Sequence, residues 1–182
     1  MPELSLNILD VVQNSVTAGA DLIRLVVHGD TRADTLEIRI IDNGCGMTEE
    51  QVRRVVDPFY TTRTTRKVGL GVPFFKMAAE MAGGSFSIDS TVGKGTEVTA
   101  RFQLSHIDRM PLGDLPGTMM TLIGPNPDID FCLDYRLDEA GFVMDTREMK
   151  AVLDGVSLAE PEVLEFIRND LAEQIAACGP AV

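Results

Sequence analysis

Apolar and polar positions along the first 104 residues follow the periods of helices and strands. Apolar residues three or four apart predict helices, whereas alternation and β-branched runs predict strands. The predicted helices cover residues 3–18, 48–56 and 72–81, and the predicted strands cover residues 22–28, 36–41, 85–90 and 97–104. Residues 57–70 show no period and are rich in Thr, Arg and Lys, so we expect a mobile loop there.

Residues 105–182 follow a less regular pattern. Residues 115–123 are predicted to be helical, because a Gly-Pro pair follows their last apolar position. Residues 131–137 alternate as a strand does, and residues 141–144 are expected to return beside them as a hairpin. An apolar stripe at helical spacing begins just after Pro161, a residue type favoured in the first helical turn. We therefore expect a helix, a hairpin and then helices.

Charge is divided unevenly along this chain of 182 residues, whose net charge is −12. Residues 1–104 hold 11 Lys and Arg against 13 Asp and Glu, whereas residues 105–182 hold 5 against 15. This difference predicts a boundary near residue 104, between a first domain and an acidic α+β extension. The acidic balance argues against a nucleic-acid partner, because such proteins need cations to displace counterions from phosphates.

No segment of the sequence predicts a membrane span or a secretion signal. The longest apolar runs, such as Leu25-Val26-Val27, are far shorter than the ~20 residues that cross a bilayer. The first residues lack the basic start and apolar core of a signal peptide. Three cysteines without CxxC spacing argue against a disulfide framework or a zinc site. We expect a cytoplasmic protein with reduced thiols and no membrane partner.

Two polar segments are candidates for chemistry. Asp10 and Asn14 stand four residues apart on the first predicted helix, so they project from one face. Such a pair can hold Mg²⁺ or polarise a water molecule, although a solvated helix face is its commoner role. The run Asp42-Asn43-Gly44-Cys45-Gly46 follows a predicted strand, where glycines allow close backbone approach and Asp42 can accept from an exocyclic amine. Alone, that run is also compatible with an ordinary turn.

Two glycine-rich segments follow. Gly69-Leu70-Gly71 opens a predicted helix, whose N-terminus offers free N–H groups and a positive dipole end to phosphate. Arg63, Arg66 and Lys67 lie on the expected loop before it, where they can close over phosphates and neutralise their charge. Gly93-Lys94-Gly95-Thr96 joins two predicted strands, and alone it is simply a hairpin turn.

In this order and at this spacing, the four segments resemble the sequence boxes of the GHKL ATPase superfamily, whose members share the Bergerat fold. The resemblance covers about residues 4–104. It points to the histidine-kinase branch, because residues 57–63, Asp-Pro-Phe-Tyr-Thr-Thr-Arg, are similar to its F box. It implies an α/β two-layer sandwich, with a mixed, largely antiparallel sheet covered by helices, that binds ATP and Mg²⁺ as cofactors.

The resemblance also assigns roles to residues. Asn14 matches the metal-binding Asn, Asp42 matches the acid that binds adenine, and Thr96 matches the Thr that supports adenine binding. Asp10 stands where hydrolytic members carry a Glu, which makes it the candidate catalytic base, although its side chain is shorter by one methylene. The residues implied to bind the nucleotide are Asn14, Asp42, Gly44, Gly46, Arg63, Lys67, Gly69, Leu70, Gly71 and Thr96.

The sequence departs from histidine kinases in one respect that bears on function. Those kinases carry a phospho-accepting His in a helix pair before the metal-binding Asn, whereas this sequence has Asn14 near its start and only His28 and His106. We therefore expect a stand-alone ATP-binding chain that does not phosphorylate its own His. Two functions stay open: an ATP hydrolase or protein kinase acting on a partner, and a non-catalytic, ATP-gated regulator similar to anti-sigma factors. In either case the extension is expected to present an acidic surface to a basic protein partner.

Overall fold

The structure is a computed structural model that describes residues 2–59 and 70–182. Its helices are α1 (Leu4–Thr17), α2 (Glu49–Val55), α3 (Gly71–Met81), α4 (Leu115–Ile123), α5 (Thr146–Leu153) and α6 (Pro161–Cys178). Its strands are β1 (Leu22–Asp30), β2 (Thr35–Asp42), β3 (Ser85–Thr91), β4 (Gly95–Gln103), β5 (Asp130–Leu137) and β6 (Ala140–Asp145). Every predicted helix and strand is present, with ends displaced by at most two residues. The pattern predicts helices after the hairpin but locates only the one now seen as α6, so α5 had no predicted residue range.

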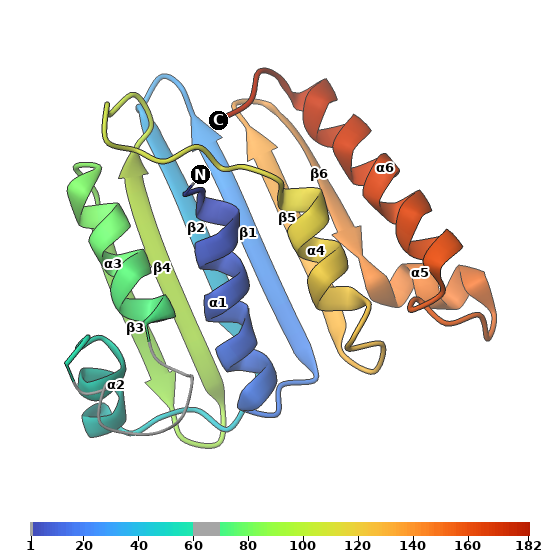
Figure 1. The fold of residues 1–182 in the computed structure, drawn as a ribbon, viewed down its shortest axis with the longest axis horizontal. Helices are drawn as coiled ribbons and strands as arrows, with labels where there is room; N and C mark the ends of the chain where they lie inside the picture. Colours follow the sequence, from blue (N-terminus) through green and yellow to red (C-terminus); the bar gives the residue numbers. More distant parts are fainter. Residues whose placement is uncertain (1, 60–69) are drawn as a thin grey trace.

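The six strands of the described residues form one mixed sheet in the order β3-β4-β2-β1-β5-β6. Neighbouring strands are antiparallel except β1 and β5, which pair in parallel from Leu22 opposite Asp130 to Gly29 opposite Leu137. Figure 1 shows α3, α1, α4 and α6 side by side over one face of this sheet. The expected two-layer α/β sandwich with a mixed, largely antiparallel sheet is therefore confirmed.

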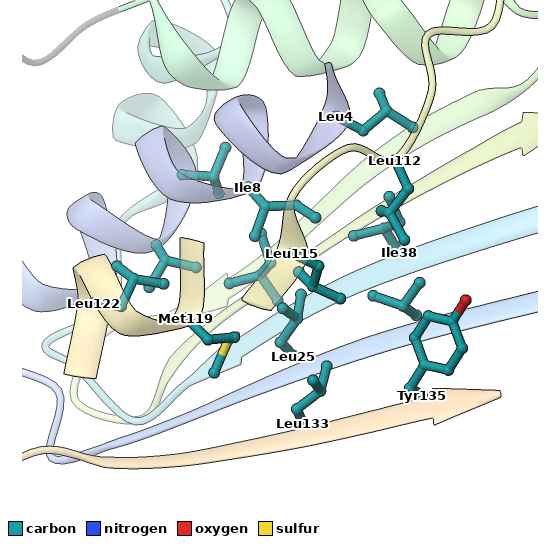
Figure 2. Close-up of a cluster of buried hydrophobic side chains, with 14 of the residues drawn as sticks. Leu4, Ile8, Leu25, Ile38, Leu112, Leu115, Met119, Leu122, Leu133 and Tyr135 are labelled. Atoms are coloured by element: carbon teal, nitrogen blue, oxygen red, sulfur yellow. The ribbon is translucent and has the colours of Figure 1, made fainter. Parts of the chain in front are cut away.

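The hydrophobic core lies between this sheet and the helices α1 and α4 (Figure 2). Leu4 and Ile8 of α1 are fully buried in it, as is Ile38 of β2. The part of the core that comes from residues 105–182 includes Leu115, Met119, Leu122, Leu133 and Tyr135. Both parts of the chain thus share one sheet and one core. A functional boundary near residue 104 stays a prediction.

Side-chain caps fix where α2 and α4 begin, as the Asp145 side chain does for α5. At α2, the Thr48 hydroxyl accepts from the N–H of Gln51 at 3.2 Å, and Gln51 Oε1 accepts from the N–H of Thr48 at 2.8 Å. At α4, Asp114 Oδ1 accepts from the N–H of Gly117 at 2.9 Å. The first turn of α3 differs, because Leu70 precedes it and makes no side-chain cap hydrogen bond. Among residues 2–59 and 70–182, no side chain is recorded as a cap for the first N–H groups of α3.

Two further observations concern possible membrane spans and the state of the cysteine thiols. None of the helices among residues 2–59 and 70–182 combines the length and the apolar composition that a membrane span requires. The thiols of Cys45, Cys132 and Cys178 are free. Burial raises the pKa of the Cys132 thiol, so this side chain stays protonated at neutral pH and behaves as a small apolar residue.

Candidate functional site

A cavity of about 280 Å³ opens between the C-terminal half of α1 and the ends of β2, β3 and β4. Apolar side chains, including Val11, Ile88 and Val98, form much of its wall. Its polar lining contains three of the predicted site residues, Asn14, Asp42 and Thr96, together with Ser15. Asn14 and Asp42 are both half-buried there. An apolar cleft with a few convergent polar groups is the usual form of a small-molecule site.

The Asp42 carboxylate is held in a fixed orientation by two donors. The hydroxyl of Ser15, a buried residue of α1, donates to Asp42 Oδ2 at 2.6 Å. The N–H of Gly44 donates to Asp42 Oδ1 at 2.8 Å. Hydrogen bonds to an ionised acceptor are among the stronger ones in proteins, and each carboxylate oxygen keeps a second lone pair. Asp42 can therefore accept a further donor inside the cavity without reorienting.

Strand register places three polar residues in a row across the sheet. Asp42 of β2 pairs with Thr96 of β4, and Thr96 pairs in turn with Ser90 of β3. The Ser90 and Thr96 hydroxyls are 2.8 Å apart. Ser90 Oγ also accepts from the N–H of Met47 at 2.8 Å and lies 3.1 Å from the carbonyl oxygen of Gly95. Ser90 thus connects Thr96 to the glycine loop that contains Asp42.

The glycine loop after β2 packs tightly on its surroundings. A Cβ at Gly46, where φ is 72°, would lie 2.0 Å from the carbonyl oxygen of Thr91. A Cβ at Gly44 would lie 2.8 Å from the Cβ of Ala18 at the end of α1. Any larger residue at either position would force the loop away from its neighbours. These glycines hold the loop against α1 and β3, while their expected contact with a ligand stays a prediction.

Asp10 lies apart from this cavity, in an adjoining groove between α1 and α3. That groove, of about 340 Å³, is also lined by Leu6, Phe74 and Met77. Asp10 is close to the start of α3, because a Cβ at Gly71 would lie 2.9 Å from the Cβ of Asp10. Partial burial raises the pKa of the Asp10 carboxyl above its ordinary value. Asp10 and Asn14 therefore serve neighbouring parts of the α1 surface, one at the groove and one in the cavity.

The predicted phosphate-binding residues are only partly described. Leu70 and Gly71 stand at the N-terminus of α3, as expected for a segment that opens a helix. Arg63, Lys67 and Gly69 lie outside the described residues, so their proposed contacts with phosphates stay predictions. Within residues 2–59 and 70–182, no group of three or more His, Cys, Asp and Glu side chains is arranged to hold a metal ion. A Mg²⁺ site that uses Asn14 would take its other ligands from phosphate and water, which is common for this ion.

Two residues of the site were not singled out by the sequence pattern. The sequence pattern gives no role to Ser15, and Ser90 belongs to none of the four segments. The helical period gave a signal for Ser15, because it is adjacent to Asn14 and faces the sheet. Ser90 could be found only from the pairing of β3 with β4, since it stands directly opposite Thr96.

Comparison with known proteins agrees with this geometry. A sequence profile of the family described as Histidine kinase-, DNA gyrase B-, and HSP90-like ATPase matches residues 2–106. The chain is 29% identical over 132 residues to sensor histidine kinase RcsC of Escherichia coli strain K12, a match that covers 68% of this chain and 14% of that protein. It is 32% identical over 98 residues to sporulation kinase D of Bacillus subtilis, covering 54% of this chain and 19% of that protein. The chain therefore spans less than a fifth of the length of either kinase.

A solved structure resembles a larger part of the chain. This is the crystal structure of the N-terminal domain of a DNA repair protein, with a TM-score of 0.51 and 17% identity. The match covers 80% of this chain and 52% of that one. At this identity the likeness concerns the fold alone. Because the family profile ends at residue 106, the fold likeness extends past it into the extension.

Proposed function

The chain belongs, through residues 2–106, to the histidine kinase-, DNA gyrase B- and HSP90-like ATPase family, and from this premise we propose that it binds Mg-ATP in the cavity beside Asp42 and uses it for phosphoryl transfer. The observation that carries the proposal is the Asp42 carboxylate, fixed by Ser15 and Gly44 at the end of β2. The adenine amine is the donor that this acceptor suits. Val11, Ile88 and Val98 supply the apolar walls that the faces of a purine ring require.

The phosphates would extend from this cavity toward α3. The N-terminus of α3 offers N–H groups at Gly71 that the Leu70 side chain does not cap, and the helix dipole favours negative charge there. Asn14 lies in the cavity lining on the α1 side, where its amide oxygen can serve as a ligand of Mg²⁺. Bound Mg²⁺ neutralises phosphate charge, and Arg63 and Lys67 are expected to add to that neutralisation.

Asp10 is the candidate general base for transfer to water or to a hydroxyl or imidazole of a partner. Its place beside Gly71 supports this role, because the γ-phosphate is expected near the start of α3. Its raised pKa also supports it, since a more basic carboxylate accepts a proton more readily. Two relatives are named as kinases, which supports a protein as the acceptor. We accordingly favour an ATP hydrolase or a protein kinase.

One observation favours a second candidate, an ATP-gated regulator with little turnover. Asp10 opens onto the α1–α3 groove and is not part of the cavity lining. A base must reach hydrogen-bond distance of the proton that it removes, and an Asp reaches about 1 Å less than a Glu. A chain of this kind would bind ATP tightly and change its partner affinity without rapid hydrolysis.

The test of ATP binding is the substitution Asp42→Asn, followed by isothermal titration with ATP and Mg²⁺. The affinity should fall at least about tenfold, because an amide presents a donor where the site needs an acceptor. Asp89→Asn is the matched control, since Asp89 is exposed on β3 and should leave the affinity unchanged. Equal affinity of wild type and Asp42→Asn would remove the basis of the proposal.

The rate of ATP turnover distinguishes the hydrolase or kinase from the ATP-gated regulator. If Asp10 is a base, Asp10→Asn should lower the rate of phosphate release by about 10²–10⁴-fold and leave the ATP affinity within severalfold. Asp10→Glu should raise the rate if reach limits it. A wild-type rate that is measurable and unaffected by Asp10→Asn would favour the ATP-gated regulator. Asn14→Ala should remove the Mg²⁺ dependence of binding in both cases.

A further inference from the structure

An apolar groove lies between α5 and α6, in the part of the chain beyond the family match. Its volume is about 250 Å³, and nearly all of its lining is apolar, with Met149, Val152 and Phe166 among the side chains. Val152 is 84% exposed and Phe166 is 72% exposed, so both present their apolar surface to solvent. The rim carries two carboxylates, Glu148 of α5 and Asp170 of α6. An exposed apolar surface with a polar rim is typical of an interaction site.

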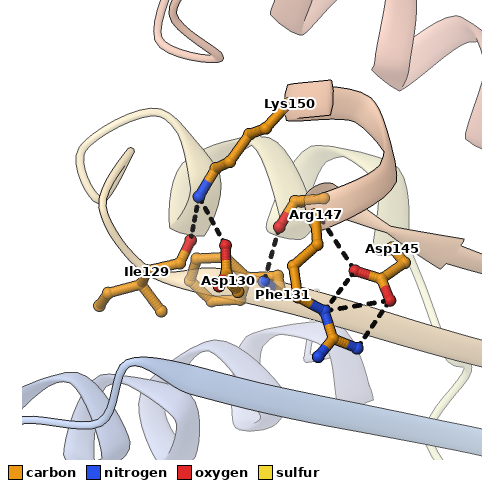
Figure 3. Close-up of polar contacts among 7 residues, drawn as sticks. Ile129, Asp130, Phe131, Asp145, Arg147 and Lys150 are labelled. Atoms are coloured by element: carbon orange, nitrogen blue, oxygen red, sulfur yellow. Dashed lines mark hydrogen bonds and ion pairs between the residues drawn. The ribbon is translucent and has the colours of Figure 1, made fainter. Parts of the chain in front are cut away.

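The walls of the groove are fixed before anything binds. Lys150 Nζ donates to Asp130 Oδ1 at 2.7 Å and to the carbonyl oxygen of Ile129, which ties α5 to the start of β5 (Figure 3). The Thr146 hydroxyl, fully buried, accepts from the N–H of Phe131 at 2.8 Å. Binding to a preformed groove costs less ordering than binding to mobile segments.

The cations of the extension are already engaged within the chain. Figure 3 shows Lys150 with Asp130 and Arg147 with Asp145. Arg109 donates to the carbonyl oxygens of Leu104 and Met110. Arg136 forms an ion pair with Asp134, and Arg168 forms one with Asp114.

The carboxylates at the groove are left without such partners. Within residues 2–59 and 70–182, neither Glu148 nor Asp170 has an ion pair. Asp170 accepts from the side-chain amide of Gln174 at 2.7 Å. Because residues 105–182 hold 15 acidic against 5 basic residues, their surface attracts cations supplied from outside.

We propose that the α5–α6 groove binds an amphipathic basic helix of a partner protein, with its apolar row against Phe166 and Val152 and its Lys or Arg residues at Glu148 and Asp170. Two helices that expose an apolar seam accept a third helix by the same packing that joins helices in a core.

Electrostatic repulsion argues against two other occupants of the groove, a second copy of this chain and an anionic lipid surface. A second copy of this chain carries a net charge of −12 and would bring its own carboxylates to the groove. Anionic lipid headgroups would be repelled for the same reason. The groove lies at the β6 end of the sheet, whereas α2 and α3 lie at the β3 end (Figure 1). The proposal therefore concerns a second site and does not rest on ATP binding.

The test selects ligands for the full chain, without nucleotide, from a phage-displayed library of random peptides about five helical turns long. Enriched peptides should carry apolar residues at i, i+3, i+4 and i+7, flanked by Lys or Arg. Fluorescence anisotropy with the most enriched peptide then measures affinity. Phe166→Ala, and Glu148→Lys combined with Asp170→Lys, should each weaken binding at least about tenfold. Because these side chains line a surface groove, the substitutions should leave the fold intact.

Glu139→Lys combined with Glu165→Lys is the matched control. It changes the net charge equally at exposed positions outside the groove, and it should keep the affinity within about twofold. Absence of enrichment, or equal loss of affinity in the control, would overturn the proposal. A dimer in sedimentation that dissociates on Phe166→Ala would assign the groove to a second copy. Flotation with anionic vesicles that is lost on Phe166→Ala would assign it to a membrane.

Discussion

At the scale of single residues, the polarity of the site depends on one hydroxyl. Ser90 Oγ accepts a hydrogen bond from the N–H of Met47. It also lies within hydrogen-bond distance of the carbonyl oxygen of Gly95, which can act only as an acceptor. If its single proton goes to Gly95, the Thr96 hydroxyl must donate to Ser90. Thr96 then turns its lone pairs toward the cavity. Ser90 thus orients Thr96 as an acceptor for a ligand, as Ser15 orients Asp42.

Ser90→Ala should therefore weaken ATP binding about five- to tenfold. It removes the partner of Thr96 and leaves the N–H of Met47 without its acceptor, and a neutral hydrogen bond contributes about 1 kcal/mol. Isothermal titration measures the change. Ser87→Ala is the control, because Ser87 is exposed and lies on the opposite face of β3. Equal affinities of the two variants would show that Ser90 plays no part in binding.

The sequence marks Asp42 and Thr96 as candidates more clearly than it marks Ser90. Asp42 and Thr96 stand in short runs with turn residues, which make them recognisable without a structure. Ser90 shares a face of β3 with Phe86 and Ile88, so alternation separates it from Ser87 but does not show which residue it faces on the next strand. Its role arises from pairing across the sheet, which a single-sequence pattern does not contain.

At the scale of elements, α5 shows where periodicity fails. Its eight residues, Thr146–Leu153, follow β6 directly, and Thr146 is its one buried residue. Its apolar residues Met149, Val152 and Leu153 stand at helical spacing but cover only about one turn, which is too short to establish a period in the sequence. It is fixed instead by Asp145, whose Oδ1 accepts from the N–H of Arg147 at 2.9 Å at the helix start. By contrast α1, with six buried residues at helical spacing, could be predicted from the pattern alone.

The turn between β1 and β2 is joined to the end of β4 by one carboxylate. Asp34 accepts from the N–H and the hydroxyl of Ser105 and from the amide of Gln103. These hydrogen bonds, led by that of the Ser105 hydroxyl, hold the pKa of Asp34 below its ordinary value of 3.8. A lowered pKa in the folded state means that stability is present above pH 3.8 and is lost as the pH falls through the lowered value.

Asp34→Asn should lower the melting temperature at pH 7, and the difference from wild type should shrink as the pH falls below 3.8. Asn is the suitable replacement, because φ at residue 34 is 55° and Asn tolerates that conformation. Thermal denaturation followed by circular dichroism at several pH values measures the effect. Asp89→Asn controls for loss of one exposed charge. A difference that does not change with pH would assign the effect to local structure and not to the carboxylate.

At the scale of the whole molecule, the acidic extension completes the sandwich that carries the residues proposed to bind ATP. β5 pairs with β1 along eight positions, and α4 packs beside α1. The compositional shift near residue 104 therefore marks a change in surface charge, while the core continues across it. This continuity could not be predicted from the sequence, since the parallel pairing of β1 with β5 joins segments about 100 residues apart.

A chain cut after residue 104 should consequently lose its cooperative thermal transition. The cut removes the partner strand of β1 and the buried side chains Leu115, Met119, Leu122, Leu133 and Tyr135. Each such side chain contributes about 1.5–3 kcal/mol, and five together rival the ~5–15 kcal/mol that stabilises a whole domain. β1 would also become an edge strand, still paired with β2 but without a partner on its other side, and an exposed strand edge promotes aggregation.

Circular dichroism melts and size-exclusion chromatography of the shortened chain provide the measurement. The control keeps the full length and carries Glu139→Lys with Glu165→Lys, which removes acidic charge from the extension and leaves its core untouched. If lost core and sheet contacts are the cause, the control should melt as wild type does and the shortened chain should aggregate. A shortened chain that stays monomeric, melts cooperatively near the wild-type temperature and binds ATP would instead make residues 1–104 an independent domain. In that case β5 and α4 would be an attached layer, and the boundary in charge would also be a boundary in folding.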